Sequence, residues 1–242
     1  MAETLYPLPD SQIEHFLEHG WIKLTGCFSR EQAAELQKDL WTRLGMDPED
    51  MGTWDTKNES GRVNMPIHKY FPVTDIAPKA WSAICQLLGG EHRVNDSASS
   101  WKDSFIVNLG TPSTHHHPVP PQSLSNWHVD GDFFVHYLDS PEQALLVIPL
   151  WTDIVPSGGG TIICPPGIPH IAQHLYAHPE GVSSRMTPRA QNPTFAPEGQ
   201  DLSFYCDIAR RMPDEAFVEV TGECECEFAK EGEGYYESAG WG

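Results

Sequence analysis

Basic residues are scarce in this chain of 242 residues, which carries 15 Lys and Arg against 34 Asp and Glu and a formal net charge of -19. Such a charge repels the phosphate backbone of nucleic acids and the head groups of anionic membranes. We therefore expect neither a nucleic acid nor a membrane as a partner. The ordinary interpretation of the acidic excess is that it keeps the protein soluble.

Long hydrophobic runs are also lacking, and we expect no secretory leader. The longest strongly apolar run, 144–151, contains Pro149 and falls far short of the about 20 residues that cross a bilayer. The N-terminus does not place an apolar stretch behind a basic start, as a secretory signal does. Six cysteines are spread thinly and form no dense framework, so we expect reduced thiols. Together these absences predict a cytoplasmic protein.

The order of helix and strand signals predicts one domain of the α+β class, mainly β. A chain of this length suits a single barrel or sandwich. Capping signals and helical spacing predict helices over 10–19, from Ser29 onward and over 79–88. A loop rich in Pro, Ser and His, 110–126, leads into a β-rich block. The strands expected in that block are 127–137, 145–151, 161–164 and 217–220, with a short helix within 166–180.

The strongest chemical signal is the segment WHVDGD at 127–132. Alternate residues of a strand point to the same face, so we predict that His128 and Asp130 project together. One imidazole and one carboxylate are two of the three ligands in the facial triad of non-haem iron oxygenases, whose opposite face stays open for a cosubstrate and dioxygen. A His-x-Asp pair is also common by chance, and a surface pair or a structural hydrogen bond is the alternative.

Other segments occur in a definite order around this pair. A Pro-rich loop precedes it, the apolar segment LLVIPLWTDI at 145–154 follows it, and a glycine turn opens GGGTIICPPG at 158–167. Together with the opening residues 13–32, these segments resemble the phytanoyl-CoA dioxygenase-like family of Fe(II)/2-oxoglutarate-dependent oxygenases, and within it a mostly fungal branch. The resemblance covers residues 10–223.

This resemblance implies a double-stranded β-helix, which is a jelly-roll or cupin-like fold, with flanking N-terminal helices in a domain of residues 1–223. It implies a non-haem Fe(II) centre, held by His128 and Asp130, that uses 2-oxoglutarate as cosubstrate. The implied activity is oxidation of a small organic molecule, of the hydroxylation type.

The same comparison suggests residues for the 2-oxoglutarate pocket. Thr161, which follows the glycine turn, and Trp151 are the first candidates, and Asn108 and Ser125 are weaker ones. The alternative is that these are ordinary strand and core residues.

Two parts of that family's site have no counterpart in this sequence. The family places a third ligand, a histidine, on a later core strand, and an arginine beyond it pairs with 2-oxoglutarate. Here no histidine follows His178 and no arginine follows Arg211. Residues 224–242 are rich in Glu and Gly, which predicts a disordered acidic tail and missing C-terminal core strands. An aberrant end, an inactive relative and a substitute ligand are three explanations of this pattern.

Candidates for a substitute ligand exist upstream. His170, His174 and His178 recur every four residues, so a helix would place them on one face, but a solvated helix face is the favoured interpretation. His136 is expected to face away from the iron. The run at 115–117 is interpreted as an exposed histidine-rich loop that binds metal only adventitiously.

Three functions therefore stay open. The first is the Fe(II)/2-oxoglutarate-dependent dioxygenase, and the second is an inactive relative that serves as a binding or partner module. The third is a cupin-like metal binder that uses no 2-oxoglutarate. A homodimer is a related expectation, because a second copy could supply the missing strands.

Overall fold

The computed structural model describes residues 6–54, 61–110, 117–131, 133–143, 145–191, 201–222 and 224. The α-helices are α1 (Asp10–His19), α2 (Arg30–Gln37), α3 (Leu40–Leu44), α4 (Val73–Ile76), α5 (Pro78–Leu87), α6 (Ile168–Ala177) and α7 (Ser203–Ala209). The strands are β1 (Arg62–Asn64), β2 (Tyr70–Pro72), β3 (Ser100–Lys102), β4 (Ile106–Asn108), β5 (Ile162–Ile163) and β6 (Val218–Glu219). Short 3-10 helices are η1 (Met51–Thr53), η2 (Glu91–Arg93), η3 (Asp96–Ser99), η4 (Pro121–Ser123), η5 (Pro141–Gln143), η6 (Pro165–Gly167) and η7 (Asp214–Ala216).

The strands form small antiparallel sheets of two strands each. β1 pairs with β4, β2 with β3, and β5 with β6. Isolated bridges join His136 to Val182 and Ile154 to Gly222. The predicted α+β class is confirmed, although helices cover more of the described residues than strands do. The expected strands 127–137 and 145–151 are not strands in the described part, where the first has only the His136 bridge as a backbone partner.

Helix boundaries follow the local signals in the sequence. α1 ends at Gly20, whose φ of +76° is the left-handed conformation that glycine adopts without a Cβ clash. α2 begins with the predicted capping box, in which the Ser29 hydroxyl accepts a hydrogen bond from the Gln32 N–H at 3.2 Å. The Gln32 side chain accepts one in return from the Ser29 N–H at 2.8 Å. The expected helix at 79–88 is present as α5.

We predict that Ser29→Ala lowers the free energy of unfolding by about 1 kcal/mol, because the first turn of α2 loses its side-chain acceptor. Urea denaturation followed by circular dichroism measures the change. Ser123→Ala is the matched control, since Ser123 is exposed and its hydroxyl makes no hydrogen bond within the described residues. The control should stay within about 0.5 kcal/mol of the parent, and an equal loss in both variants would contradict the role of the cap.

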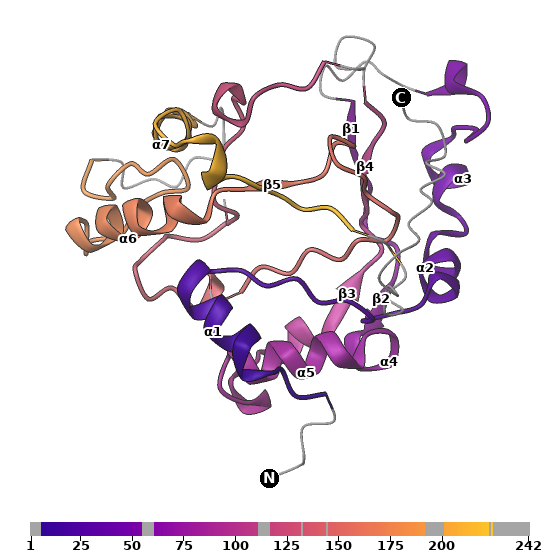
Figure 1. The fold of residues 1–242 in the computed structure, drawn as a ribbon, viewed down its shortest axis with the longest axis horizontal. Helices are drawn as coiled ribbons and strands as arrows, with labels where there is room; N and C mark the ends of the chain where they lie inside the picture. Colours follow the sequence, from indigo (N-terminus) through magenta and orange to yellow (C-terminus); the bar gives the residue numbers. More distant parts are fainter. Residues whose placement is uncertain are drawn as a thin grey trace.

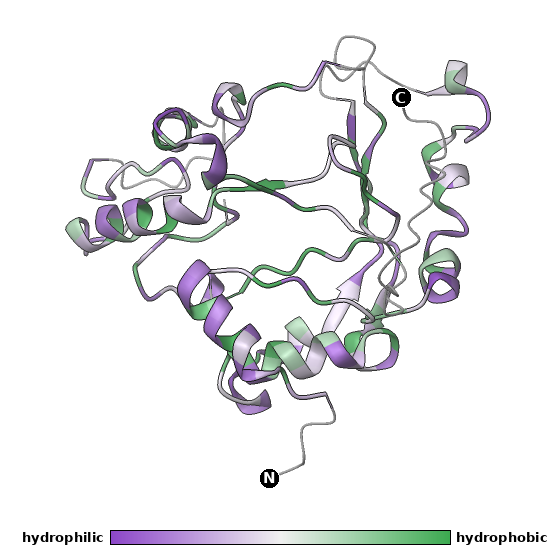
Figure 2. Ribbon diagram, viewed as in Figure 1, coloured by the Kyte–Doolittle hydropathy of each residue, from purple (hydrophilic) through white to green (hydrophobic). Residues whose placement is uncertain are grey.

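Helices surround a middle crossed by extended segments (Figure 1). In that view α6 and α7 lie at one side, α2 and α3 lie at the other, and α1, α4 and α5 lie along the lower edge. Hydrophobic residues dominate the extended segments through the middle, whereas α1 carries a hydrophilic face (Figure 2). The apolar segments therefore run between the helices, and part of their apolar surface stays exposed.

An aromatic cluster around Trp151 forms one part of the core. The indole stacks on Phe28 with ring centroids 4.6 Å apart. Phe71, Trp101 and Phe105 meet it edge-on at 6.0–6.2 Å. Such offset and T-shaped arrangements are the favourable ones for aromatic pairs. The backbone is tied in as well, because the Gln37 side chain donates to the carbonyl of Trp151 at 2.6 Å.

A second core cluster lies beneath α6 and α7. Its buried members are Leu175, Val182, Met186 and Tyr205. Trp127 and Val129 pack against them, so the segment that carries the His-x-Asp pair is anchored on this cluster.

No helix of the described residues is long and apolar enough to cross a bilayer. Cys85, Cys164 and Cys206 are free thiols, in line with the expected reduced state. The predicted acidic tail lies outside the described residues, apart from Cys224.

Candidate metal centre

His128 and Asp130 lie on one face of an extended segment. Trp127 and Val129 point into the core cluster beneath α6, and the indole N–H of Trp127 donates to the carbonyl of Pro121 at 2.8 Å. The intervening side chains face outward, with His128 42% and Asp130 62% exposed. This alternation places the two predicted ligands on the same face, although the segment has no strand partner in the described residues.

The imidazole of His128 is oriented by the backbone. Its Nδ1 lies 2.7 Å from the carbonyl oxygen of Asn126. A carbonyl oxygen only accepts, so Nδ1 carries a hydrogen and Nε2 is the nitrogen that remains for a ligand. Histidines that bind metals are held in this way, by donation from the other ring nitrogen to a carbonyl or carboxylate.

The remaining nitrogen faces the carboxylate. Nε2 of His128 lies 3.1 Å from Oδ1 of Asp130. One divalent cation could therefore bind both atoms, and an imidazole nitrogen with a carboxylate oxygen is a donor set that suits Fe(II).

The charges of the pair support each other. The hydrogen bond with Asp130 raises the pKa of His128, against the opposing effect of partial burial. The same bond lowers the pKa of Asp130 below its ordinary value. Both shifts favour a protonated imidazole beside an ionised carboxylate. A divalent cation would have to displace the proton on Nε2, because ligands bind metal in their deprotonated forms.

A tight turn follows Asp130 and is fastened by a buried histidine. His136 is 0% exposed, and its Nε2 donates to the carbonyl of Gly131 at 2.5 Å. The Gln143 side-chain amide donates to Nδ1 of His136 at 3.1 Å. The ring of Phe134 stacks on the imidazole, with centroids 4.5 Å apart. This imidazole is thus occupied on both nitrogens.

Only glycine fits at the start of this turn. Gly131 has a φ of +120°, and a Cβ there would lie 2.1 Å from the Phe134 ring. The roles of Gly131 and Gln143, and this bond of His136, were not predicted from the sequence. The glycine directly after Asp130 was the one feature of the sequence that could have indicated a turn there.

Asn108, one of the predicted cosubstrate residues, is paired with an arginine on the neighbouring strand. Arg62 on β1 is opposite Asn108 on β4 in the antiparallel register. The Asn108 side chain donates to the carbonyl of Gly159 at 2.9 Å, which joins β4 to the glycine turn before Thr161. The positive charge of Arg62 also acts on His128 and Asp130, where it lowers the pKa of each. The charge of Arg62 thus reaches the pair, and strand register places Asn108 beside Arg62.

The other predicted cosubstrate residues have different settings. Trp151 is half-buried in the aromatic cluster, which is the core role considered as its alternative. Thr161 has an exposed side chain, and its carbonyl accepts from the N–H of Val220 at 2.7 Å. Ser125 is exposed three residues before His128 and makes no side-chain hydrogen bond within the described residues.

The chain matches no family model, no curated protein and no solved structure. No related protein therefore adds evidence about this site beyond its geometry.

Two of the upstream histidines, His174 on α6 and His178 directly after it, have other partners. The Nε2 atom of His174 bonds the carbonyl of Met186 at 2.9 Å, and His178 pairs with Glu180 at 3.3 Å. Over the described residues no group of three or more His, Cys, Asp or Glu side chains is arranged to hold a metal. Of the run at 115–117, the first two histidines lie outside the described residues, and His117 is exposed.

Proposed function

We propose that this chain is a non-haem Fe(II)/2-oxoglutarate-dependent dioxygenase that oxidises a small organic molecule. The observation that carries the proposal is the 3.1 Å approach of His128 Nε2 to Asp130 Oδ1, with the imidazole oriented by the Asn126 carbonyl. The proposed architecture is a double-stranded β-helix of the phytanoyl-CoA dioxygenase-like kind. The antiparallel pairs β1–β4 and β5–β6 would belong to its core.

In this proposal each residue near the pair has a distinct task. His128 and Asp130 hold Fe(II), while Trp127 and Val129 anchor their segment in the core. Arg62 contributes positive charge, which a dicarboxylate cosubstrate requires nearby. Bound iron and 2-oxoglutarate would together supply the oxidising power for the reaction with dioxygen.

The test measures iron uptake and succinate formation by the full chain. We predict that it binds one Fe(II) and converts 2-oxoglutarate to succinate without added substrate. His128→Ala and Asp130→Ala should each weaken Fe(II) binding by at least about 100-fold, since loss even of a group that only orients a ligand costs 10–100-fold. Anaerobic titration of the metal and chromatography of the organic acids measure the two quantities.

A matched control is available on the same chain. His178 and Glu180 form another exposed histidine–carboxylate pair two residues apart, at 3.3 Å. His178→Ala should leave Fe(II) binding within about twofold of the parent, because the variant removes an imidazole outside the proposed centre. Equal loss in the His178 and His128 variants, or a parent chain that takes up neither iron nor cosubstrate, would overturn the proposal.

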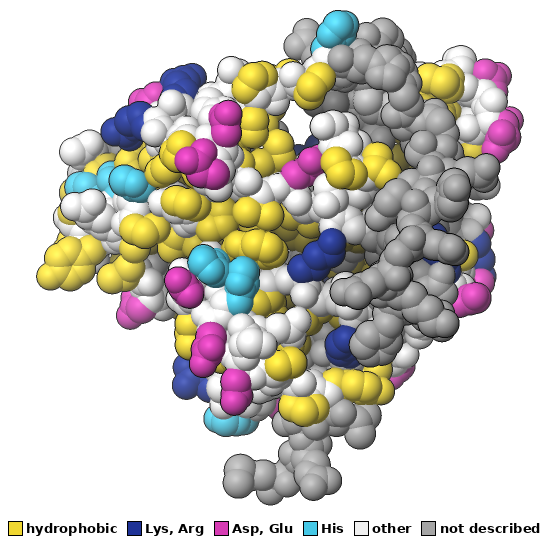
Figure 3. Space-filling view, viewed as in Figure 1, with side chains coloured by type: hydrophobic (Ala, Val, Ile, Leu, Met, Phe, Trp, Pro, Cys, Tyr) yellow, Lys and Arg dark blue, Asp and Glu magenta, His cyan; other side chains and the backbone are white. Residues whose placement is uncertain are grey.

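A second function, a binding or partner module without catalysis, is favoured by two observations. The described residues hold two candidate ligands rather than a triad. Three consecutive apolar side chains are also exposed, with Leu146 62%, Val147 37% and Ile148 37% exposed. Hydrophobic side chains form a broad band on the face shown in Figure 3, and contiguous apolar surface is typical of association sites.

The same experiment separates the candidates. A stable homodimer in light scattering, together with no iron uptake, is the result that the partner module requires. Iron uptake without succinate is the result that a cupin-like metal binder requires.

A further inference from the structure

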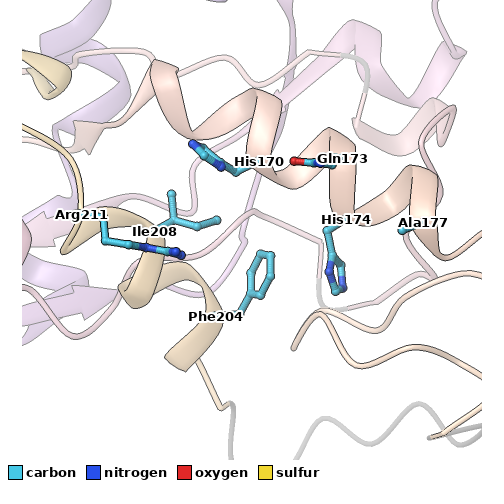
Figure 4. A pocket seen from close by; sticks show the side chains of 7 residues that line it. All are labelled: His170, Gln173, His174, Ala177, Phe204, Ile208 and Arg211. Atoms are coloured by element: carbon cyan, nitrogen blue, oxygen red, sulfur yellow. The ribbon is translucent and has the colours of Figure 1, made fainter.

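A groove lies between α6 and α7, apart from the His128–Asp130 pair, with which it shares no residue. It encloses about 300 Å³. The groove is lined by His170, Gln173, His174 and Ala177 from α6, by Phe204 and Ile208 from α7, and by Arg211 just beyond α7 (Figure 4). The spacing explains the convergence, because residues three, four and seven apart share one face of a helix.

The side chains that line the groove are either basic or uncharged, whereas the chain as a whole is acidic. The chain carries a net charge of -19, yet no Asp or Glu lines the groove. Arg211, His170 and Gln173 present hydrogen-bond donors, whereas Phe204 and Ile208 present apolar surface. In Figure 4, Phe204, Ile208 and Arg211 lie on the α7 side of the groove, and His170 and Gln173 lie on α6.

Several contacts hold the lining in place. Nε of Arg211 donates to the carbonyl of Asp207 at 2.7 Å, and within the described residues its two terminal nitrogens make no hydrogen bond. His174 is held by the Met186 carbonyl and packs on the Phe204 ring, with centroids 4.6 Å apart. These side chains are therefore positioned before any ligand arrives, which reduces the entropy lost on binding.

The polar side chains of His170 and Gln173 are available to bind a ligand in the groove. Within the part of the chain that the structure describes, the side chains of His170 and Gln173 make no hydrogen bond or ion pair. A planar guanidinium matches a carboxylate through two parallel hydrogen bonds. Imidazole and amide donors beside it would complete the coordination of an anionic head group.

We infer that the α6–α7 groove binds a small organic anion in which a carboxylate is joined to a compact aromatic or apolar body. The carboxylate lies against Arg211 and His170, and the body packs on Phe204 and Ile208. The groove is open to solvent and offers one guanidinium, so the expected affinity for a minimal ligand is weak, with a Kd of about 1 mM. The inference does not depend on the metal centre.

Benzoate is the probe, and benzamide and benzylamine are its neutral and cationic counterparts of nearly equal shape. Titration of the full ¹⁵N-labelled chain, followed by NMR, should show benzoate shifting the Arg211 Nε–H resonance. Benzamide and benzylamine should cause no shift at the same concentration. Arg211→Gln should weaken benzoate binding at least about tenfold, because a charge-assisted hydrogen bond is lost.

Arg210→Gln is the matched control. It removes the same charge one residue away, from a side chain that pairs with Asp207 at 2.7 Å and does not line the groove. The control should bind benzoate within about twofold of the parent. Arg211→Lys, which keeps the charge without the fork, should give an intermediate affinity. Equal binding of benzoate and benzamide, or equal loss in the Arg210 and Arg211 variants, would overturn the inference.

Discussion

Replacement of Asp103 by alanine is expected to lower the free energy of unfolding by about 3–5 kcal/mol, the range for breaking a buried ion pair. Asp103 is 5% exposed, and its Oδ2 lies 3.0 Å from Nη1 of Arg43, which is itself largely buried. Its Oδ1 accepts from the backbone N–H groups of His68 and Lys69 at 2.7 and 2.9 Å. The variant would leave a guanidinium and two N–H groups without their acceptor.

Arg43 also joins this ion pair to the backbone through hydrogen bonds. Its Nη2 donates to the carbonyls of Pro66 and Asp103, at 2.7 and 3.1 Å. Because one side chain joins α3 to two later segments, its misplacement would affect all of them. Asp103→Asn, which keeps the shape and one acceptor oxygen, should cost less than the alanine variant.

The same carboxylate predicts a dependence of stability on pH. Burial raises the pKa of Asp103, but the bonds from Lys69 and His68 and the charge of Arg43 outweigh burial and leave the pKa below its ordinary value. A lowered folded-state pKa means that the unfolded chain binds the proton more tightly. The contribution is therefore complete above the unfolded pKa of about 4 and is lost as the pH falls through the folded-state value.

Urea denaturation at pH 7 and at several acidic values measures both effects. Asp207→Ala is the control, because Asp207 forms an exposed ion pair with Arg210 on α7. Exposed pairs contribute about 0–1 kcal/mol. Two results would contradict the stabilising role of the Arg43–Asp103 ion pair. One is that Asp103→Ala loses no more stability than this control, and the other is that it loses the same amount at pH 7 and below pH 3.

His136→Leu is expected to lower the free energy of unfolding by about 2–4 kcal/mol, since two partly buried groups lose their partner at about 1–3 kcal/mol each. The groups are the carbonyl of Gly131 and the amide of Gln143. Leucine fills a similar volume, so a cavity contributes little. Chemical denaturation measures this loss.

The variant also tests whether the turn positions Asp130. In the proposed centre, release of the Gly131 carbonyl should weaken Fe(II) binding about tenfold, which is the lower end of the effect of groups that orient ligands. His136→Gln, whose side-chain amide can still donate to Gly131, should recover part of that affinity. If the leucine variant lost stability but bound Fe(II) as the parent does, His136 would have a structural role alone.

Features encoded by neighbouring residues were predictable from the sequence. The capping box of Ser29 and Gln32, the end of α1 at Gly20 and the shared face of His128 and Asp130 each depend on residues no more than three apart. α7 was not predicted from the sequence, although Tyr205 and Ile208 are buried on it.

Features that join distant residues could not be read in this way. Arg43 and Asp103 are 60 residues apart, and Arg62 faces Asn108 only through strand register. The α6–α7 groove likewise depends on how two helices pack. In each case the tertiary arrangement, and not a local pattern, creates the contact. The ring of Trp151 shows the same limit, because a strand residue and a core residue look alike in sequence.

The cluster around Trp151 also has a consequence for the order in which the chain can fold during synthesis. Phe28, Phe71, Trp101 and Phe105 all precede the indole that they contact. The ribosome must therefore release residue 151 before these rings acquire their common partner, while α1 and α2 can form from local signals much earlier. Contacts between residues so far apart pay a loop-closure cost first. A nascent chain shorter than 151 residues should accordingly expose apolar rings, and that interval is when a chaperone would bind it.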